Sequence, residues 1–354
     1  MMNKDKYHNY SPEPLWPGII NNEEPPLIIA GPCSAETREQ LLSTARELHG
    51  HGVKILRAGI WKPRTYPGDF EGVGEDALSW LIEAKMETGM LVGTEVGTAA
   101  HTEKALGAGL DFLWIGARTT ASPFAIQEIA EVLGGSSVPV LVKNPLNPSI
   151  DFWKGAVYRL LEAGVKRIGL IHRGFDIGVP KDLRNTPLWS VVAEMRRDLP
   201  HLSIYLDPSH IAGRRDYLGK LIQVAYLLKY DGIMIESHLN PDKAWSDRNQ
   251  QITPSELAET ISNLPMVSEQ QLYLLRDELR GVDERLLLLL SIRRKLSGEI
   301  GGVKRAYGLT AYQETQYLSK LKEITSAAKL YDLPEELLRH LYAIIHDDSV
   351  FLQK

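Results

Sequence analysis

Residues 204–210 read Ile-Tyr-Leu-Asp-Pro-Ser-His, a short apolar run that ends in an acid, a proline, a serine and a histidine. The same arrangement recurs downstream, where Gly232–Ile235 leads directly into Glu236 and then His238. Short apolar runs bounded by turn residues are typical of buried strands. The two runs therefore predict strands that deliver ionisable side chains at their carboxyl ends.

The same pattern extends back to Leu27, with short apolar runs alternating with amphipathic segments. The runs are Leu27–Ala30, Val53–Leu56, Leu91–Thr94, Phe112–Ile115, Val138–Val142, Arg167–Ile171, Ser203–Leu206 and Gly232–Ile235. Helical patterns between or after them include Arg38–His49, Ala77–Glu87, Phe152–Ala163, Tyr217–Lys229 and Ser255–Ser262. Strands that alternate with helices in this number predict an α/β fold, the TIM (β/α)8 barrel.

The composition is that of a globular chain with room for a barrel and a smaller domain. The chain has 354 residues, of which 44% are hydrophobic and 24% charged, whereas a β/α barrel needs about 250 residues. No apolar run approaches the roughly 20 residues of a membrane span, and the first residues do not resemble a signal peptide. A single cysteine favours a reducing compartment, and the net charge of −5 gives no sign of nucleic-acid binding. We expect a cytoplasmic protein without membrane or nucleic-acid partners.

Ionisable side chains follow every predicted strand, and in a barrel these positions share the C-terminal mouth, where active sites are built. Any one of them has a simpler explanation, because charged residues are common in loops. Six cations would surround the mouth: Arg57, Lys62, Arg64, Arg118, Lys143 and Arg173. So much like charge is self-repulsive unless anions fill the site, and arginine and lysine both bind phosphate. The mouth is predicted to bind small, highly anionic molecules.

Four side chains at the same mouth suit a divalent metal. His210, Glu236 and Asp247 lie in one segment, and Cys33 follows the first strand, which neighbours the eighth in a closed barrel. One imidazole, two carboxylates and one thiolate suit a borderline or oxygen-loving divalent ion such as Mn²⁺, Fe²⁺, Co²⁺ or Zn²⁺, and among these we expect Mn²⁺. Cys33 has a second interpretation as a small buried residue. A metal beside an anion-binding mouth indicates carbon–carbon bond formation onto an aldehyde.

Six motifs in the barrel region occur in the order found in a known family. They are Gly31-Pro-Cys-Ser34, Lys62-Pro-Arg-Thr65, Gly116-Ala-Arg118, Arg173-Gly174, Asp207-Pro-Ser-His210 and Glu236-Ser-His238 followed by Ala244-Trp-Ser-Asp247. Residues 27–262 thereby resemble the 3-deoxy-D-arabino-heptulosonate 7-phosphate (DAHP) synthases related to the 3-deoxy-manno-octulosonate 8-phosphate synthases. The resemblance implies a metal-dependent barrel that condenses phosphoenolpyruvate with erythrose 4-phosphate, the first step toward the aromatic amino acids. The alternative is an octulosonate 8-phosphate synthase, but the Lys62-Pro-Arg-Thr65 motif argues against it.

The resemblance also implies a role for each matching residue. The metal ligands would be Cys33, His210, Glu236 and Asp247. Phosphoenolpyruvate would be held by Arg57, Lys62, Arg118, Lys143 and Arg173, and erythrose 4-phosphate by Arg64, Thr65, Asp207 and Ser209. Lys62 would also deliver a proton to the new alkoxide. His172 stands where relatives often have an acid, and residues 1–26, an extended Pro-rich arm, are too short for the regulatory domain of some relatives.

The pattern changes at residues 263–268, which we interpret as a linker. From Leu272 to Val303 apolar residues recur at alternating spacings of three and four, which predicts a long helix packed against partner helices. Arg293 falls on this apolar seam, where it is costly unless an anion meets it or it sets a coiled-coil register. Helical patterns at 314–329 and 335–352 complete an all-α three-helix domain spanning residues 269–354.

This region resembles the all-helical chorismate mutases through Leu275-Arg-Asp-Glu-Leu279, Val282-Asp-Glu-Arg-Leu-Leu287, Arg293-Arg294, Lys304 and Asp347-Asp-Ser-Val-Phe-Leu-Gln353. The resemblance implies the rearrangement of chorismate to prephenate in a pocket built from Arg276, Arg293, Lys304, Gln316 and Gln353. It also implies an intertwined helical homodimer in which Arg276 enters the neighbour's site. Gln316 replaces an arginine of the family, so a non-catalytic ligand sensor and dimerisation module is the alternative. Fusion of the two domains predicts feedback by prephenate or chorismate.

Overall fold

The computed structural model describes residues 12–18, 27–64, 66–177, 183–264, 269–328 and 333–353. The chain divides into two compact units, Met1–Leu264 and Pro265–Lys354. Among the described residues, none of the helices combines the length and the apolar character that crossing a bilayer requires.

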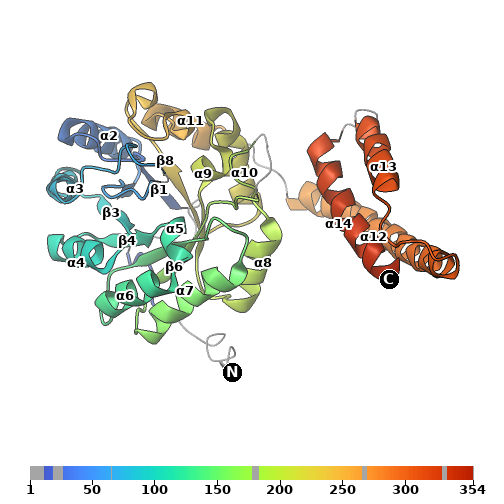
Figure 1. Ribbon diagram of the computed structural model, residues 1–354. Helices are drawn as coiled ribbons and strands as arrows, with labels where there is room; N and C mark the ends of the chain where they lie inside the picture. The colour runs from blue at the N-terminus through green and yellow to red at the C-terminus, as the bar shows by residue number, and fades with distance from the viewer. Residues whose placement is uncertain are drawn as a thin grey trace. The chain divides into compact units, whose positions relative to one another are not determined.

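The first unit confirms the predicted TIM barrel: eight parallel strands close into a ring in sequence order (Figure 1). The strands are β1 (Leu27–Gly31), β2 (Ile55–Arg57), β3 (Leu91–Val96), β4 (Phe112–Ile115), β5 (Val140–Lys143), β6 (Ile168–His172), β7 (Ile204–Leu206) and β8 (Gly232–Glu236). Closure pairs β1 with β8, and Gly31 lies opposite Glu236. Cys33 and Glu236, far apart in sequence, are thereby brought to neighbouring strand ends.

Helices surround the strands on the outside of the barrel (Figure 1). They are α2 (Arg38–Gly50), α3 (Asp76–Thr88), α4 (Ala99–Ala108), α6 (Pro123–Leu133), α7 (Ile150–Glu162), α8 (Trp189–Asp198), α10 (Leu218–Leu227) and α11 (Pro254–Ser262). Two shorter helices, α5 (Ala117–Thr120) and α9 (Pro208–Ala212), directly follow the carboxyl ends of β4 and β7. Short 3₁₀ helices, η1 (Arg215–Tyr217), η2 (Pro241–Lys243) and η3 (Arg248–Gln250), lie in the loops around β8. Thr253 caps α11, because its hydroxyl accepts from Glu256 N while the Glu256 carboxylate accepts from Thr253 N.

The interior of the barrel is filled by large side chains and is closed at its N-terminal end by Trp16. The Trp16 indole donates a hydrogen bond of 2.7 Å to the hydroxyl of Tyr205, and its ring meets Phe112 edge-on at 5.4 Å. Leu15 is buried beside it, and Glu13 N donates to Lys166 O just before β6. The described part of the predicted arm is therefore a packed plug at this end.

The second unit is all-α, as predicted, and consists of α12 (Glu269–Ala306), α13 (Glu314–Ala327) and α14 (Glu335–Gln353). α12 runs unbroken for 38 residues through three glycines near its end. Gly301 permits close packing there, because a Cβ at this position would lie 2.7 Å from the Cα of Gln353 on α14. The apolar seam of α12 stays exposed within the chain at Leu279, Val282, Leu286, Leu289, Leu296, Ile300 and Val303.

Candidate functional site

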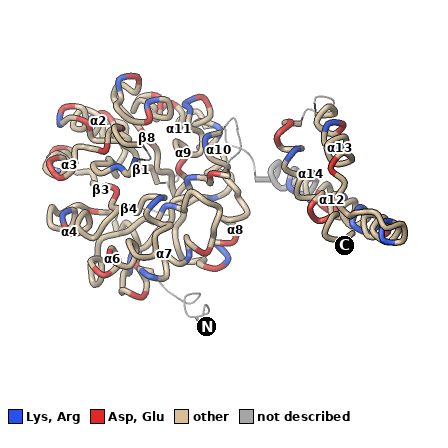
Figure 2. The backbone as a smooth tube through the Cα atoms, viewed as in Figure 1, with Lys and Arg blue, Asp and Glu red and all other residues tan. Residues whose placement is uncertain are grey.

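A cavity of about 530 Å³ opens among the carboxyl ends of the barrel strands, within the size range of ligand sites. Its cationic lining consists of Lys62, Arg64, Arg118, Lys143, Arg173 and Arg184. Five of these six belong to the predicted cation cluster. Elsewhere Lys and Arg are interspersed with Asp and Glu along the chain (Figure 2). The cavity thus collects basic side chains from several different strand ends, as an anion site requires.

Arg57, the remaining predicted cation, lies beneath the cavity and does not line it. It is 2% exposed, and its guanidinium donates to Glu236 Oε1 and to the Cys33 carbonyl, each at 3.2 Å. The indole of Trp114 lies 4.9 Å below it. Arg57 therefore holds a carboxylate of the candidate metal site in place.

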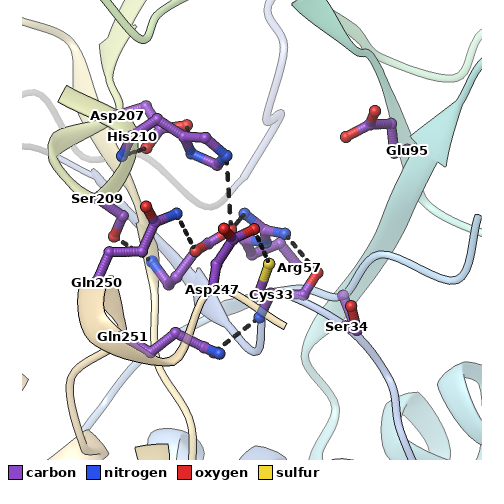
Figure 3. A network of polar contacts seen from close by, with 12 residues as sticks. Cys33, Ser34, Arg57, Glu95, Asp207, Ser209, His210, Asp247, Gln250 and Gln251 are labelled. Carbon is purple, nitrogen blue, oxygen red and sulfur yellow. Dashed lines mark hydrogen bonds and ion pairs between the residues drawn. The ribbon is translucent and has the colours of Figure 1, made fainter. Parts of the chain in front are cut away.

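The candidate metal ligands form two adjacent pairs, and Figure 3 shows Cys33, Asp247 and His210 among them. Cys33 Sγ lies 3.3 Å from Asp247 Oδ2, and His210 Nε2 lies 3.8 Å from Glu236 Oε1. Within the described ranges, the His, Cys, Asp and Glu side chains do not form a group of three or more in a metal-holding arrangement. The donor set of thiol, imidazole and two carboxylates nevertheless suits a borderline divalent ion, and Arg57 and Gln250 connect the pairs.

Backbone conformation places two of these ligands. Gly31 has a φ of +154°, and a Cβ there would lie 2.0 Å from the carbonyl oxygen of Arg57. Only glycine fits this approach, which sets the turn that carries Cys33. Asp247 itself has a φ of +43°, a left-handed conformation that is uncommon outside glycine and is often found at functional sites.

The protonation states of the candidate metal ligands in the two donor pairs favour the binding of a cation. Burial raises the pKa of the Cys33 thiol to about 12, and the charge of Glu236 adds to this effect. Burial opposes ionisation of Glu236 and Asp247 as well, but neighbouring cations outweigh it and lower the pKa of both carboxyls. The acids are thus charged at neutral pH, whereas the thiol needs a further cation to ionise.

Lys62 is the cation nearest to the thiol. Its ammonium donates to Cys33 Sγ at 2.8 Å and to the Cys33 carbonyl at 3.2 Å. Burial acts to lower the pKa of Lys62, but its interactions with Cys33, Glu236 and Asp247 together raise it above its usual value. Lys62 therefore carries a proton at the edge of the cavity.

Asp207 and Ser209, which were predicted to bind the sugar, are not among the side chains that line the cavity. Both are fully buried below the cavity. Asp207 Oδ2 accepts from Lys143 Nζ at 3.0 Å and lies 2.8 Å from His210 Nδ1, while Ser209 Oγ accepts from Glu236 N at 2.9 Å. A carboxylate behind an imidazole orients a metal-binding histidine. Thr65, the other residue predicted at the sugar end, lies outside the described residues.

Sequence reasoning missed three residues that tie the pairs together. Arg184 donates to Asp247 Oδ1 at 3.0 Å and to Gln250 Oε1 at 2.6 Å. Gln250 donates to Glu236 Oε2 at 2.7 Å, and Gln251 accepts from Cys33 N at 2.9 Å. The two glutamines closely follow Asp247 in the sequence. Their position beside a predicted metal ligand could have identified them as candidate site residues. No motif marks Arg184.

The ring nitrogens of His172 make their polar contacts with residues other than Arg173. Its ring is buried in the outer layer, with Nδ1 2.9 Å from the Tyr230 hydroxyl and Nε2 2.6 Å from Pro187 O. Burial lowers the pKa of His172 to about 4, so the imidazole is neutral. Arg173 instead donates to Asn185 Oδ1 at 3.1 Å. A histidine at 172 therefore adds no charge beside Arg173 at neutral pH.

A second cavity lies within the helical unit, and four of the five residues predicted for chorismate line it: Arg293, Lys304, Gln316 and Gln353. Arg293 Nη1 donates to Ser349 Oγ at 2.5 Å, and Lys304 Nζ donates to Gln353 Oε1 at 2.7 Å. Arg276 is exposed and is not part of this lining. His346, Tyr317 and Lys320, which sequence reasoning did not single out, also line the cavity.

The fold and the first cavity define a (β/α)8-barrel protein whose mouth gathers cationic side chains beside a candidate metal site. The profile of the DAHP synthetase I family matches residues 8–271. The chain belongs to this family. The profile of chorismate mutase type II matches residues 275–354, so the helical unit is a chorismate mutase type II domain.

The curated relatives agree with this assignment. A phospho-2-dehydro-3-deoxyheptonate aldolase of Thermotoga maritima is 39% identical over 225 residues, which span 64% of this chain and 64% of the relative. A 2-dehydro-3-deoxyphosphooctonate aldolase of Desulfatibacillum aliphaticivorans is 29% identical over 67% of this chain and 89% of the relative.

Solved structures show the same likeness. The crystal structure of the Thermotoga maritima aldolase, a DAHP synthase, has a TM-score of 0.60 at 34% identity, covering 72% of this chain and 69% of that one. A truncated form of the Thermotoga maritima enzyme has a TM-score of 0.58 at 33% identity, covering 72% of this chain and 87% of that one.

Proposed function

We propose that the barrel condenses phosphoenolpyruvate with erythrose 4-phosphate and water, giving DAHP and inorganic phosphate. The observation that carries this proposal is a cavity with six cationic side chains beside two donor pairs. Two phosphate groups and a carboxylate would neutralise the cations. Family membership and the Thermotoga maritima relative support the same reaction.

Each side chain has a defined task in this reaction. Arg118, Lys143 and Arg173 hold phosphoenolpyruvate, and Arg64 holds the phosphate of the sugar. The enolpyruvate C3 forms a bond to the aldehyde carbon, and Lys62 donates its proton to the aldehyde oxygen as charge develops there. Water then adds at C2, and the C2–O bond breaks to release phosphate. The held geometry supplies much of the rate enhancement.

We infer a divalent metal, Mn²⁺ in preference to Fe²⁺, Co²⁺ or Zn²⁺, held by Cys33, His210, Glu236 and Asp247. When bound, the metal acts as a Lewis acid on the aldehyde. Cys33→Ala and His210→Ala should lose synthase activity and metal while keeping the fold, which circular dichroism and metal analysis would check. Synthase activity retained by Cys33→Ala after chelation would refute this ligand set.

Substrate choice is the open question for the barrel, because 2-dehydro-3-deoxyphosphooctonate aldolases are also relatives. We expect turnover with erythrose 4-phosphate and at most slow turnover with arabinose 5-phosphate. The higher identity to the heptonate aldolase supports this expectation. One assay of phosphate release with each sugar decides between them, and faster release with arabinose 5-phosphate would reverse the assignment.

We propose that the helical unit rearranges chorismate to prephenate, with Arg293 and Lys304 binding its carboxylates and Gln353 facing the breaking ether bond. Gln316 favours a second candidate, a ligand sensor without turnover, since it supplies no charge. Ultraviolet monitoring of chorismate loss by the full-length protein separates the two. If the protein binds prephenate but does not consume chorismate, the helical unit is a ligand sensor.

We further propose a cytoplasmic homodimer formed through the exposed seam of α12, with Arg276 reaching the partner's cavity. Feedback by prephenate or chorismate on the barrel follows as a hypothesis from the fusion of the two units. Synthase rates measured with saturating prephenate or chorismate test it. Unchanged rates with both ligands would remove it.

A further inference from the structure

His346 is held rigidly at the wall of the helical cavity. It lies on α14 and shares the cavity lining with Arg293 and Lys304 of α12. Its ring stacks on Tyr317 with centroids 4.2 Å apart and an interplanar angle of 28°, and Tyr312 meets it edge-on at 5.7 Å. Two aromatic contacts therefore fix the plane of the imidazole and limit where its nitrogens can point.

One nitrogen of this ring lacks a partner. His346 Nε2 is buried and makes no hydrogen bond within the described residues. A buried polar atom without a partner destabilises the site, because its hydrogen bond to water is lost and not replaced. Arg293 and Lys304 cannot accept a hydrogen bond, and they already donate to Ser349 and Gln353, respectively. An acceptor that enters the cavity would supply the missing partner.

The charges around the ring depend on whether the cavity holds an anion. Burial lowers the pKa of His346, and Arg293 and Lys304 lower it further, while Asp347 acts in the opposite direction. Lys320 of α13 adds a third positive charge to the same lining. An anion bound to these cations would offset their repulsion of a proton on His346, and acceptance from Nε2–H would favour the charged ring.

We propose that His346 binds a carboxylate of the ligand in the helical cavity and takes up a proton as that ligand binds. The imidazolium then supplies the positive charge that Gln316 does not. This inference rests on the proposed function of the helical unit, because the ligand is taken to be a dicarboxylate such as prephenate. His346 is accordingly a ligand-binding residue whose charge is set by occupancy.

The sign of the pH dependence follows from this uptake. Ligand binding raises the affinity of His346 for its proton, so protonation must equally raise the affinity for the ligand. The additional affinity for the ligand is present below the pKa of His346 in the free protein. It is lost as pH rises past the pKa of His346 in the complex. Between these two values the Kd should increase by up to about tenfold per pH unit.

Calorimetry of prephenate binding to the full-length protein tests the proposal. Titrations at pH 6.0 to 8.0, with phosphoenolpyruvate saturating the barrel, would be repeated in buffers of different ionisation enthalpy to count protons. Wild type should take up a fraction of a proton, and its Kd should rise with pH. His346→Gln should bind without this uptake and with a flatter pH profile. His340→Gln, an exposed histidine on the same helix, should match wild type.

Three outcomes would overturn the proposal. Prephenate binding to wild type without proton uptake, or the same uptake in His346→Gln, would overturn this inference alone. A complete lack of prephenate binding to wild type would overturn the proposed function as well. NMR titration of the histidines in wild type provides a reading that does not depend on a variant, since the pKa of His346 must rise when prephenate binds.

Discussion

At the scale of single residues, Arg184 is the side chain that joins the two donor pairs. It contacts Asp247 directly and reaches Glu236 through Gln250. Partners of this kind orient metal ligands, and losing one commonly weakens metal affinity by about 10–100-fold. Arg184 therefore belongs to the support of the site, although it also lines the cavity.

We expect Arg184→Ala to weaken Mn²⁺ binding by about 10–100-fold, because Asp247 and Gln250 would lose their shared donor. The measurement is metal titration of the full-length protein after dialysis against a chelator. Arg214→Ala is the matched control, since Arg214 pairs with Asp216 at an exposed site. An unchanged Mn²⁺ affinity in Arg184→Ala would show that the metal ligands need no such support.

Residues within motifs could be located from the sequence, and residues outside them could not. Cys33, His210, Glu236 and Asp247 stand in motifs attached to strand ends, and parallel closure brings strand ends together. Arg184 lies between β6 and α8, and its contacts with Asp247 and Gln250 are distant in sequence, so no local pattern encodes them. The burial of Asp207 and Ser209 was also missed, because sequence places a residue at the mouth without showing its depth.

At the scale of elements, strands were the easiest to predict, since strands buried on both faces give continuous apolar runs. Each predicted run overlaps one strand of the barrel. The plug formed by Leu15 and Trp16 was not predicted, because two apolar residues among polar residues and prolines form neither an apolar run nor a periodic pattern. Its packing depends on contacts with Phe112 and Tyr205, which are distant in sequence.

We predict that loss of the plug lowers the stability of the barrel and leaves its substrate binding unchanged. Trp16 is 2% exposed, so Trp16→Ala should lower the free energy of unfolding of the barrel by about 3–5 kcal/mol. The KM values for the barrel substrates should stay near wild type, because the plug lies at the end opposite the mouth. Chemical denaturation and steady-state kinetics measure the two effects. Trp16→Phe, which keeps an aromatic ring but loses the donor to Tyr205, should cost less.

Stability within about 0.5 kcal/mol of wild type in Trp16→Ala would show that the barrel is closed without the plug. A large rise in KM would show that the two ends of the barrel communicate.

At the scale of the whole molecule, α12 presents an apolar seam that the other described residues of the helical unit leave exposed. We expect Leu286→Glu, on the seam, to convert the proposed dimer of helical units into monomers by burying a charge at the interface. Light scattering after gel filtration gives the mass. Leu287→Glu is the control, because Leu287 lies beside the seam and is 67% exposed, against 52% for Leu286. Equal masses for both variants and wild type would contradict an interface along this seam.

The unbroken course of α12 has a genetic consequence. Arg276 and Arg293 are separated by 17 positions (293 − 276) on one helix, which corresponds to about 25 Å. A single copy cannot bring both to one substrate, so a complete pocket would need one arginine from each of two copies. Two alleles, one with Arg276→Ala and one with Arg293→Ala, should each fail alone. When co-expressed they should complement each other, because every mixed pair contains one pocket that neither lesion touches.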